Sequence, residues 1–371
     1  MKSGFRIGRI ISIPIELHAS WFLIFGLLTW SLATGLLPQE YPELSTAWHW
    51  ILGAVTSVFF FGSVLAHELG HSVLALRNKV PVRKITLFIF GGLAQIEKEP
   101  PTPGAEFLIA IAGPLTSLGL AAVFGSLWLL DQAVPYLAAP SIWLARINLI
   151  LAVFNMIPGF PLDGGRVLRA AVWQWSGSYS RATRIASTVG QLTAYGFIGF
   201  GIFEMFMGRF MDGLWLVFIG TFLNNAASSS AAVSKLQEAI KGVRVADVMP
   251  RNLLQVPGLI TLQRLVDEYM LSAGQPSVIV GDGHDLRGVL TLQDIRALPP
   301  RKWPFTTAAQ AMSPVSSMIS VSAQTELRQA LEMMQAKGIS QVAVKESDQI
   351  VGVLTQDQIQ QYLQLRSRLG M

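Results

Sequence analysis

The sequence predicts an α-helical polytopic membrane domain, with about six transmembrane helices and a β-hairpin element, followed by an α/β domain made of a tandem repeat. Hydrophobic residues make up 51% of the 371 residues and charged residues only 14%, and the apolar excess lies in the first 225 residues. A repeat spaced by about 64 residues follows, in which GVLT at 288–291 matches GVLT at 352–355, and VADVMP at 245–250 matches AQAMSP at 309–314. We therefore expect a membrane domain over 1–225, a linker over 226–243 and the repeated unit over 244–371, with copies at about 244–300 and about 307–368.

Six apolar segments are candidates for membrane spans, because a span needs about 20 mostly apolar residues. The first run is long for a secretory signal and lacks a small-x-small cleavage site, so we interpret it as a retained helix. The predicted spans are 14–37, 50–76, 105–130, 142–157, 187–207 and 211–223.

Basic residues at the ends of these spans predict the topology. They gather before the first span, after the second, and between the fourth and fifth, which is one side of the membrane if the spans alternate. The loop 38–49 contains Glu40 and Glu43 but no Lys or Arg and is expected outside. We expect both termini in the cytoplasm and the protein in the inner (plasma) membrane. The basic residues are Lys2, Arg6, Arg9, Arg77, Lys79, Arg83, Lys84, Arg166, Arg169, Arg181 and Arg184.

Composition excludes several kinds of chemistry. The chain has no cysteine, so disulfides, thiolate nucleophiles and Cys-based zinc sites are excluded, and any metal must be held by His, Asp or Glu. The net charge of +5 sits at the ends of spans and forms no basic stripe. We therefore expect no nucleic-acid partner.

The motif His67-Glu68-Leu69-Gly70-His71 lies near the end of the second predicted span. On a helix, H-E-x-x-H places two imidazoles one turn apart on one face, with a glutamate beside them, which is typical of a zinc site with a general base. A glutamate deep in a bilayer costs about 2.5–3.5 kcal/mol, so it is expected to have a partner. The alternative is an interfacial hydrogen-bonded cluster of Glu68 with the two histidines.

A zinc site needs a third protein ligand. The best candidate is Asp163, in the stretch NMIPGFPLDGGR over 155–166, where two prolines break the fourth helix and two glycines allow a sharp turn. His18, His49 and His284 are less well placed, although His18 is nearest in depth. The alternative for Asp163 is a simple turn. Asn155 is either an amide donor to a developing oxyanion or a partner in a helix–helix hydrogen bond.

Two further features lie in the membrane half. Residues 82–96 are rich in β-branched and aromatic residues around Gly91-Gly92 and predict a β-hairpin, followed by a proline-broken loop at 97–104. Gly113-Pro114, inside the third span, is expected to kink the helix or allow close packing and is assigned no chemistry.

On the motif at 67–71, Ala112-Gly113-Pro114 and the stretch 155–166, the chain resembles the site-2 protease family of intramembrane zinc metalloproteases, specifically the prokaryotic type with a C-terminal CBS pair. The resemblance implies His67, His71 and Asp163 as ligands of one catalytic Zn²⁺, with Glu68 as general base. It also implies a membrane-protein substrate cut in regulated intramembrane proteolysis. The hairpin segment 88–96 would then either accept an extended substrate by strand addition or serve only in packing.

The tail resembles two CBS motifs, whose Gly-h-h-Thr-x-x-Asp turn implies contacts to an adenine nucleotide such as ATP or AMP. Thr291 and Asp294 match this pattern in the first copy. In the second copy Thr355 matches, but Gln358 stands at the position of Asp294, with Asp357 one place early. The pair either binds a nucleotide or is structural, including a role in homodimerisation.

Three functions are compatible with these sequence features. The leading hypothesis is an intramembrane zinc endopeptidase whose tail regulates activity or oligomerisation. The alternatives are a membrane transporter or channel with a regulatory CBS tail, and a non-catalytic scaffold that binds substrates. The H-E-x-x-H motif and Asp163 favour the enzyme, because a transport pathway does not need this donor set and all four expected catalytic positions are filled.

Overall fold

The computed structural model of the chain describes residues 4–89, 91–96, 98–130, 132–249, 254–272, 277–282, 285–315, 318–346 and 349–368. The chain divides into two units, Met1–Ser234 and Lys235–Met371.

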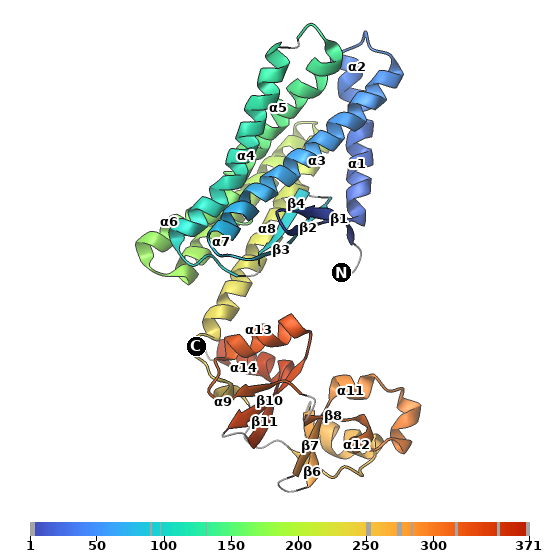
Figure 1. Ribbon diagram of the computed structural model, residues 1–371, viewed down its shortest axis with the longest axis vertical. Helices are drawn as coiled ribbons and strands as arrows, with labels where there is room; N and C mark the ends of the chain where they lie inside the picture. Colours follow the sequence, from blue (N-terminus) through green and yellow to red (C-terminus); the bar gives the residue numbers. More distant parts are fainter. Residues whose placement is uncertain are drawn as a thin grey trace. The chain divides into compact units, whose positions relative to one another are not determined.

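Long helices form most of the first unit (Figure 1). Helix α1 continues through a π-helical turn, η1, into the short α2. Helix α4 packs against α3, α5 and α6, and Pro114 lies inside α4 without ending it. The helices are α1 (Ala19–Ser31), η1 (Leu32–Leu36), α2 (Leu37–Glu40), α3 (Thr46–Arg77), α4 (Pro103–Leu130), α5 (Pro135–Asn155), α6 (Asp163–Ser176), α7 (Tyr179–Phe206) and α8 (Phe210–Ala239).

Within the described part of the chain, five helical segments are long and apolar enough to cross a membrane, so the chain is a multi-pass membrane protein. The expected count of six is not confirmed. The predicted sixth span, 211–223, is the first half of α8, whose apolar part is diluted by Asp212 and by polar residues from Asn224 onward. The five segments are Ala19–Glu40, Thr46–Arg77, Pro103–Leu130, Pro135–Asn155 and Tyr179–Phe206.

The expected hairpin at 82–96 belongs to a four-stranded sheet in the order β1-β2-β3-β4. Its strands are β1 (Gly4–Ile10), β2 (Ile13–His18), β3 (Val82–Phe88) and β4 (Gly91–Ile96). The expected start of the first helix at residue 14 is therefore wrong. Residues 13–18 alternate between buried and half-buried side chains, which is the period of a strand, and the helix begins only at Ala19.

The sheet packs on the half of α3 that carries the H-E-x-x-H motif. Ile13, Ile15 and Ile85 are buried in one cluster with Leu65 and Leu69 of α3. Strand β2 is parallel to β3, and β3 is antiparallel to β4. The sheet thus fixes β4, its outermost strand on that side, relative to the motif.

The second unit contains two small sheets. One has the order β5-β6-β7-β8, with β5 (Gln255–Val256), β6 (Ser277–Asp282), β7 (Asp285–Thr291) and β8 (Ser313–Pro314). The other has the order β11-β10-β9, with β9 (Ser320–Ser322), β10 (Gln341–Glu346) and β11 (Gln349–Thr355). The helices are α9 (Val245–Val248), α10 (Leu262–Leu265), η2 (Val266–Leu271), α11 (Leu292–Arg296), η3 (Pro300–Phe305), α12 (Ala308–Ala311), α13 (Leu327–Lys337) and α14 (Gln356–Arg368).

The two sequence repeats exchange their leading segments. Val245, at the start of the first copy, donates its backbone N–H to Thr325 O and is buried among residues of the second copy. Ala308, at the start of the second copy, is buried in the core of the first, and β8 pairs with β7. Each core therefore needs both copies, so the pair is expected to fold as one unit.

Candidate metal centre

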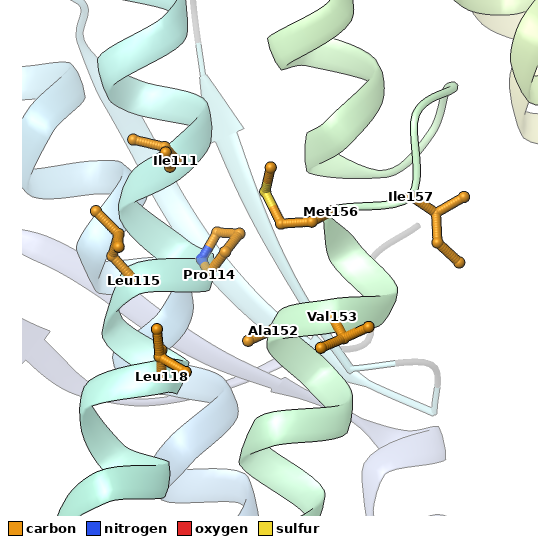
Figure 2. A pocket seen from close by; sticks show the side chains of 8 residues that line it. All are labelled: Ile111, Pro114, Leu115, Leu118, Ala152, Val153, Met156 and Ile157. Carbon is orange, nitrogen blue, oxygen red and sulfur yellow. The ribbon is translucent and has the colours of Figure 1, made fainter.

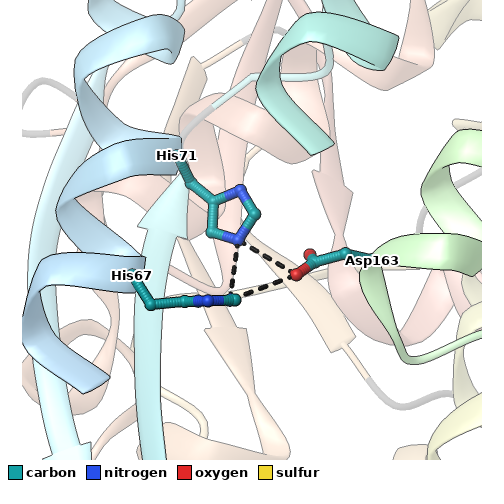
Figure 3. A group of neighbouring side chains, drawn as sticks. All are labelled: His67, His71 and Asp163. Atoms are coloured by element: carbon teal, nitrogen blue, oxygen red, sulfur yellow. Dashed lines mark hydrogen bonds and ion pairs between the residues drawn. The ribbon is translucent and has the colours of Figure 1, made fainter. Parts of the chain in front are cut away.

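Two helices bring together three side chains that could hold a metal ion. His67 and His71 lie one turn apart on one face of α3, each 4% exposed, and their Nε2 atoms are 3.2 Å apart. Asp163 approaches from α6, with its Oδ2 atom 3.2 Å from His67 Nε2 and 3.1 Å from His71 Nε2 (Figure 3). The three donor atoms form a nearly equilateral triangle.

The size of this triangle fits a tetrahedral zinc site. With zinc–ligand bonds of about 2.0–2.1 Å, two ligand atoms of a tetrahedron lie about 3.3 Å apart. The observed separations of 3.1–3.2 Å match this value. Two histidines and one carboxylate also match the donor types of a catalytic zinc, which keeps its fourth position open.

The far ring nitrogens of the histidines support the same conclusion. Nδ1 of His71 lies 2.7 Å from the backbone oxygen of Ile109, which can only accept, so Nδ1 carries the hydrogen and Nε2 presents a lone pair. Nδ1 of His67 lies 2.9 Å from the hydroxyl of Ser117. Lone pairs that face one another and a carboxylate repel unless a cation lies between them, so the residues fit a metal ion.

Gly113 of α4 lies directly against both imidazoles. A Cβ atom at this position would be 2.6 Å from His67 Nε2 and closer still to His71 Nε2. Only a residue without a side chain allows α4 to approach the ligands this closely. The close packing expected at Gly113-Pro114 is thus packing against the candidate metal ligands.

Asp163 is the first residue of α6, immediately after the expected proline-containing turn. The turn is fixed by the N–H of Phe160, which donates to Ala186 O of α7, and by Gly159, whose φ of 138° favours glycine. Burial alone would raise the pKa of the Asp163 carboxyl, but the neighbouring imidazoles of His67 and His71 outweigh it and hold that pKa well below its usual range. The position at a helix N-terminus also favours the anionic form.

Glu68 is half-buried and points toward strand β4. Its Oε2 atom accepts a hydrogen bond from the backbone N–H of Ala94 at 3.2 Å. A Cβ on Gly92 would collide with the Glu68 side chain, so β4 passes close to this carboxylate. Among the described residues, the imidazole Nε2 atoms lie next to Asp163 rather than Glu68, unlike the hydrogen-bonded cluster of Glu68 with the two histidines given above as the alternative.

Asn155 is the last residue of α5, and its Nδ2 donates to Leu151 O one turn earlier, at 3.0 Å. This hydrogen bond lies within α5 and joins Asn155 neither to Asp163 nor to another helix. The remaining histidines are elsewhere: His18 caps α1 through Ser20, and His49 Nε2 bonds to the backbone oxygen of Tyr41 in the preceding loop. His284 lies outside the described residues.

In both repeats of the tail, the residues predicted to contact a nucleotide form hydrogen bonds within their own turn. Thr291 donates from its backbone N and its Oγ1 to Asp294 Oδ2, at 2.8 and 2.7 Å. In the second copy, the Thr355 N–H donates to Gln358 Oε1 at 3.0 Å. Gln358 Nε2 also donates to Ser277 Oγ, at 3.4 Å. The two turns therefore share one local geometry but differ in charge.

Sequence reasoning missed the contribution of α4. Ile109 contacts His71 through its backbone oxygen, which every residue has, so the residue type does not reveal the contact. Ser117 and Glu106 could have been noticed as polar residues in an apolar span, since such residues in a membrane helix usually have a partner.

An apolar cavity of ≈ 480 Å³ lies between α4 and α5 beside this centre (Figure 2). Pro114 and Met156, the residues that follow Gly113 and Asn155, are both in its wall. The lining consists of Ile111, Pro114, Leu115, Leu118, Ala152, Val153, Met156 and Ile157.

Comparisons with known proteins cover nearly the whole chain. The profile of peptidase family M50 matches residues 55–134 and 131–197, and the CBS domain profile matches residues 308–365. A protein from Synechocystis sp. named as a zinc metalloprotease, sll0528, is 36% identical over 98% of this chain and 96% of its own length. A protein from Mycobacterium tuberculosis named as zinc metalloprotease Rip3 is 36% identical over 96% of this chain and 91% of its own. The solved site-2 protease from Methanocaldococcus jannaschii is 31% identical, covers 62% of this chain and 95% of its own, and superposes with a TM-score of 0.42.

Proposed function

The chain belongs to peptidase family M50 and is a membrane zinc metalloprotease with a CBS tail, and from this premise we propose that it cuts transmembrane substrates in regulated intramembrane proteolysis. The observation that carries the proposal is the triangle of His67 Nε2, His71 Nε2 and Asp163 Oδ2 beside Glu68, on a helix apolar enough to span a membrane.

Each residue of the centre has a role in hydrolysis. His67, His71 and Asp163 would hold a zinc ion, which would supply Lewis-acid polarisation of the scissile carbonyl and make the attacking water more acidic. Glu68 takes a proton from the attacking water and passes it to the amine that leaves when the C–N bond breaks. Its hydrogen bond from Ala94 orients the carboxylate without neutralising it.

Asn155 would donate to the carbonyl oxygen as negative charge develops on it. A primary amide carries two N–H groups. Since one of them is used by Leu151 O, the other is available to a substrate.

We further propose that a substrate reaches Glu68 as an added β-strand on β4. Strand β4 ends the sheet, and its Ala94 N–H points to Glu68 rather than to β3, so this edge of the strand faces the centre. A transmembrane helix must unwind before its peptide bonds are accessible, and strand pairing offers partners for the released backbone groups.

The tail, residues 244–371, is proposed to regulate activity or oligomerisation, with the linker 226–243 joining it to the membrane domain of residues 1–225. An adenine nucleotide is expected at Thr291 and Asp294 in the first copy, and Thr355 is the corresponding residue of the second. Homodimerisation through the CBS pair is the other proposed role. We propose that residues 211–223 of α8 cross the membrane as a sixth span, so that both termini are cytoplasmic. The protein is proposed to lie in the inner membrane with the basic residues flanking one side of the spans.

The direct test is cleavage of a transmembrane substrate by the purified protein in proteoliposomes. Glu68→Gln should abolish cleavage while zinc content stays unchanged. The matched control is Glu40→Gln, which alters a glutamate in an exposed pair with Arg146 and should cleave like the wild type. Equal cleavage by the Glu68→Gln and wild-type proteins would contradict the assigned role.

A further inference from the structure

One face of α4 contacts both candidate histidine ligands. Ile109 bonds to His71, Gly113 touches both imidazoles and Ser117 bonds to His67. Glu106 lies one turn before Ile109, and at 3.6 residues per turn these four positions share an arc of about 80°. The helix face that holds the histidines therefore also presents a carboxylate.

The Glu106 side chain is fully buried and forms an ion pair with Arg169 of α6. Arg169 Nε donates to Glu106 Oε1 at 2.7 Å, and its NH2 nitrogen contacts the same oxygen. The guanidinium carbon of Arg169 lies 4.8 Å from the ring centre of Phe160 and 4.6 Å from that of Tyr179. Arg169 is thus held between two aromatic rings and a buried carboxylate.

This arrangement bears directly on Asp163. Phe160 is three residues before Asp163 in the turn, and Arg169 is six residues after it on the same helix. The ion pair and the aromatic contacts therefore fix both the turn and the helix that carry the third donor. They tie both to the face of α4 that contacts the other two donors.

Stability alone does not account for such a pair. Replacing a buried ion pair by apolar residues is often neutral or stabilising, because both charges lose their hydration. Here Glu106 Oε2 has no hydrogen-bond partner among the described residues, so the carboxylate is incompletely compensated. Retention of the charged pair is better explained by the way it fixes the turn and α6 relative to α4.

We propose that the Glu106–Arg169 pair, with Phe160 and Tyr179 around the guanidinium, positions Asp163 against His67 and His71 for metal binding. These are positioning residues, since they act through Asp163 and do not contact the metal. The inference rests on the zinc site proposed above. The test of this inference measures zinc affinity, whereas the test of the protease function measures cleavage of a substrate. Either proposal can therefore fail while the other holds.

The experiment measures zinc affinity of the full-length protein in detergent by competition with a chromophoric chelator. The thermal unfolding of the zinc-free protein is recorded in parallel. Glu106→Gln and Arg169→Lys should each weaken zinc binding by about 10–100-fold, the usual effect of losing an outer partner of a metal ligand. The matched control is Glu204→Gln. Glu204 is mostly buried and pairs with Arg209 at 3.0 Å, near the end of α7 that is far from Tyr179. This variant should bind zinc within about twofold of the wild type.

Tyr179 provides a second, milder pair of variants. Tyr179→Phe keeps a ring over Arg169 and should bind zinc like the wild type, whereas Tyr179→Leu removes the ring and should weaken binding by about 2–5-fold. This comparison remains decisive if Glu106→Gln does not fold. Zinc affinities equal to that of Glu204→Gln, with only the unfolding temperature of the zinc-free protein lowered, would show a purely structural pair and overturn the proposal. So would equal zinc binding by Tyr179→Phe and Tyr179→Leu.

Discussion

Substituting Gly113 by alanine should disrupt the metal centre by adding one methyl group. The new Cβ would lie 2.6 Å from His67 Nε2 and even closer to His71 Nε2. A carbon atom normally stays about 3.5 Å from such a neighbour, so the shortfall on the His67 side alone is about 0.9 Å. Either α4 moves away by about this distance or the imidazoles rotate out of the triangle.

Both responses should weaken the site strongly. If α4 retreats, the 2.7 Å bond between His71 Nδ1 and Ile109 O lengthens to as much as about 3.6 Å, which is no longer a hydrogen bond. Loss of such an outer partner costs about 10–100-fold in metal affinity. A displacement of about 1 Å at a catalytic group costs about 100-fold in rate. We therefore expect zinc affinity to fall by at least about tenfold and cleavage by about 100-fold.

The assay is zinc stoichiometry by mass spectrometry after dialysis against a weak chelator, with helix content and thermal unfolding followed by circular dichroism. The control is Gly119→Ala on the same helix, where a Cβ meets no atom within 4 Å. Alanine favours a helix interior over glycine by about 1 kcal/mol, so the control should keep its zinc and be no less stable. Full zinc retention by Gly113→Ala, equal to that of Gly119→Ala, would refute the reasoning.

Three further outcomes are expected. Glu68→Gln should lower the cleavage rate by about 10²–10⁴-fold at unchanged zinc content, as measured by single-turnover cleavage, because it removes the base but no metal ligand; lost zinc would instead make Glu68 part of the metal site. Ser117→Ala leaves His67 Nδ1 without its partner at 2.9 Å and should weaken zinc binding by about tenfold in chelator competition, whereas unchanged affinity would mean that the hydroxyl does not orient the ring. AMP or ATP should raise the unfolding temperature of the wild type and of Asp357→Ala, which alters an exposed residue, but not that of Asp294→Ala. Equal increases in the two variants would place the nucleotide away from the first copy.

The membrane half was predictable where a periodic pattern or a motif specifies structure. The spans around His67 and Asn155 were expected close to where α3 and α5 lie, because long apolar runs have few structural alternatives. The prediction failed at residues 13–18, where a short alternating stretch joins directly to an apolar helix. A hydropathy average over about 20 residues merges the two, although the buried Ile13, Ile15 and Leu17 show the period of a strand.

The exchange of leading segments in the tail could not be predicted from the repeat alone. A repeat shows that two units are alike, but not which core each segment completes. Val245 and Ala308 are the first residues of the short helices α9 and α12, and each is buried in the core of the other copy. Sequence spacing is the same whether such segments stay or exchange, so only the packing distinguishes the two arrangements.

In the candidate site, the proposed ligands were predictable from the sequence, whereas the α4 residues that contact them were not. His67, His71 and Asp163 were expected because zinc requires particular atoms that only a few side chains carry. Ile109 contributes a carbonyl oxygen that any residue would supply, and Gly113 contributes the absence of a side chain. Substitutions of Ile109 by other aliphatic residues should therefore preserve zinc binding, whereas any side chain at 113 should weaken it. The support for these candidate ligands is thus specified by helix position rather than by residue chemistry, and a motif search finds the candidates without finding the helix that holds them.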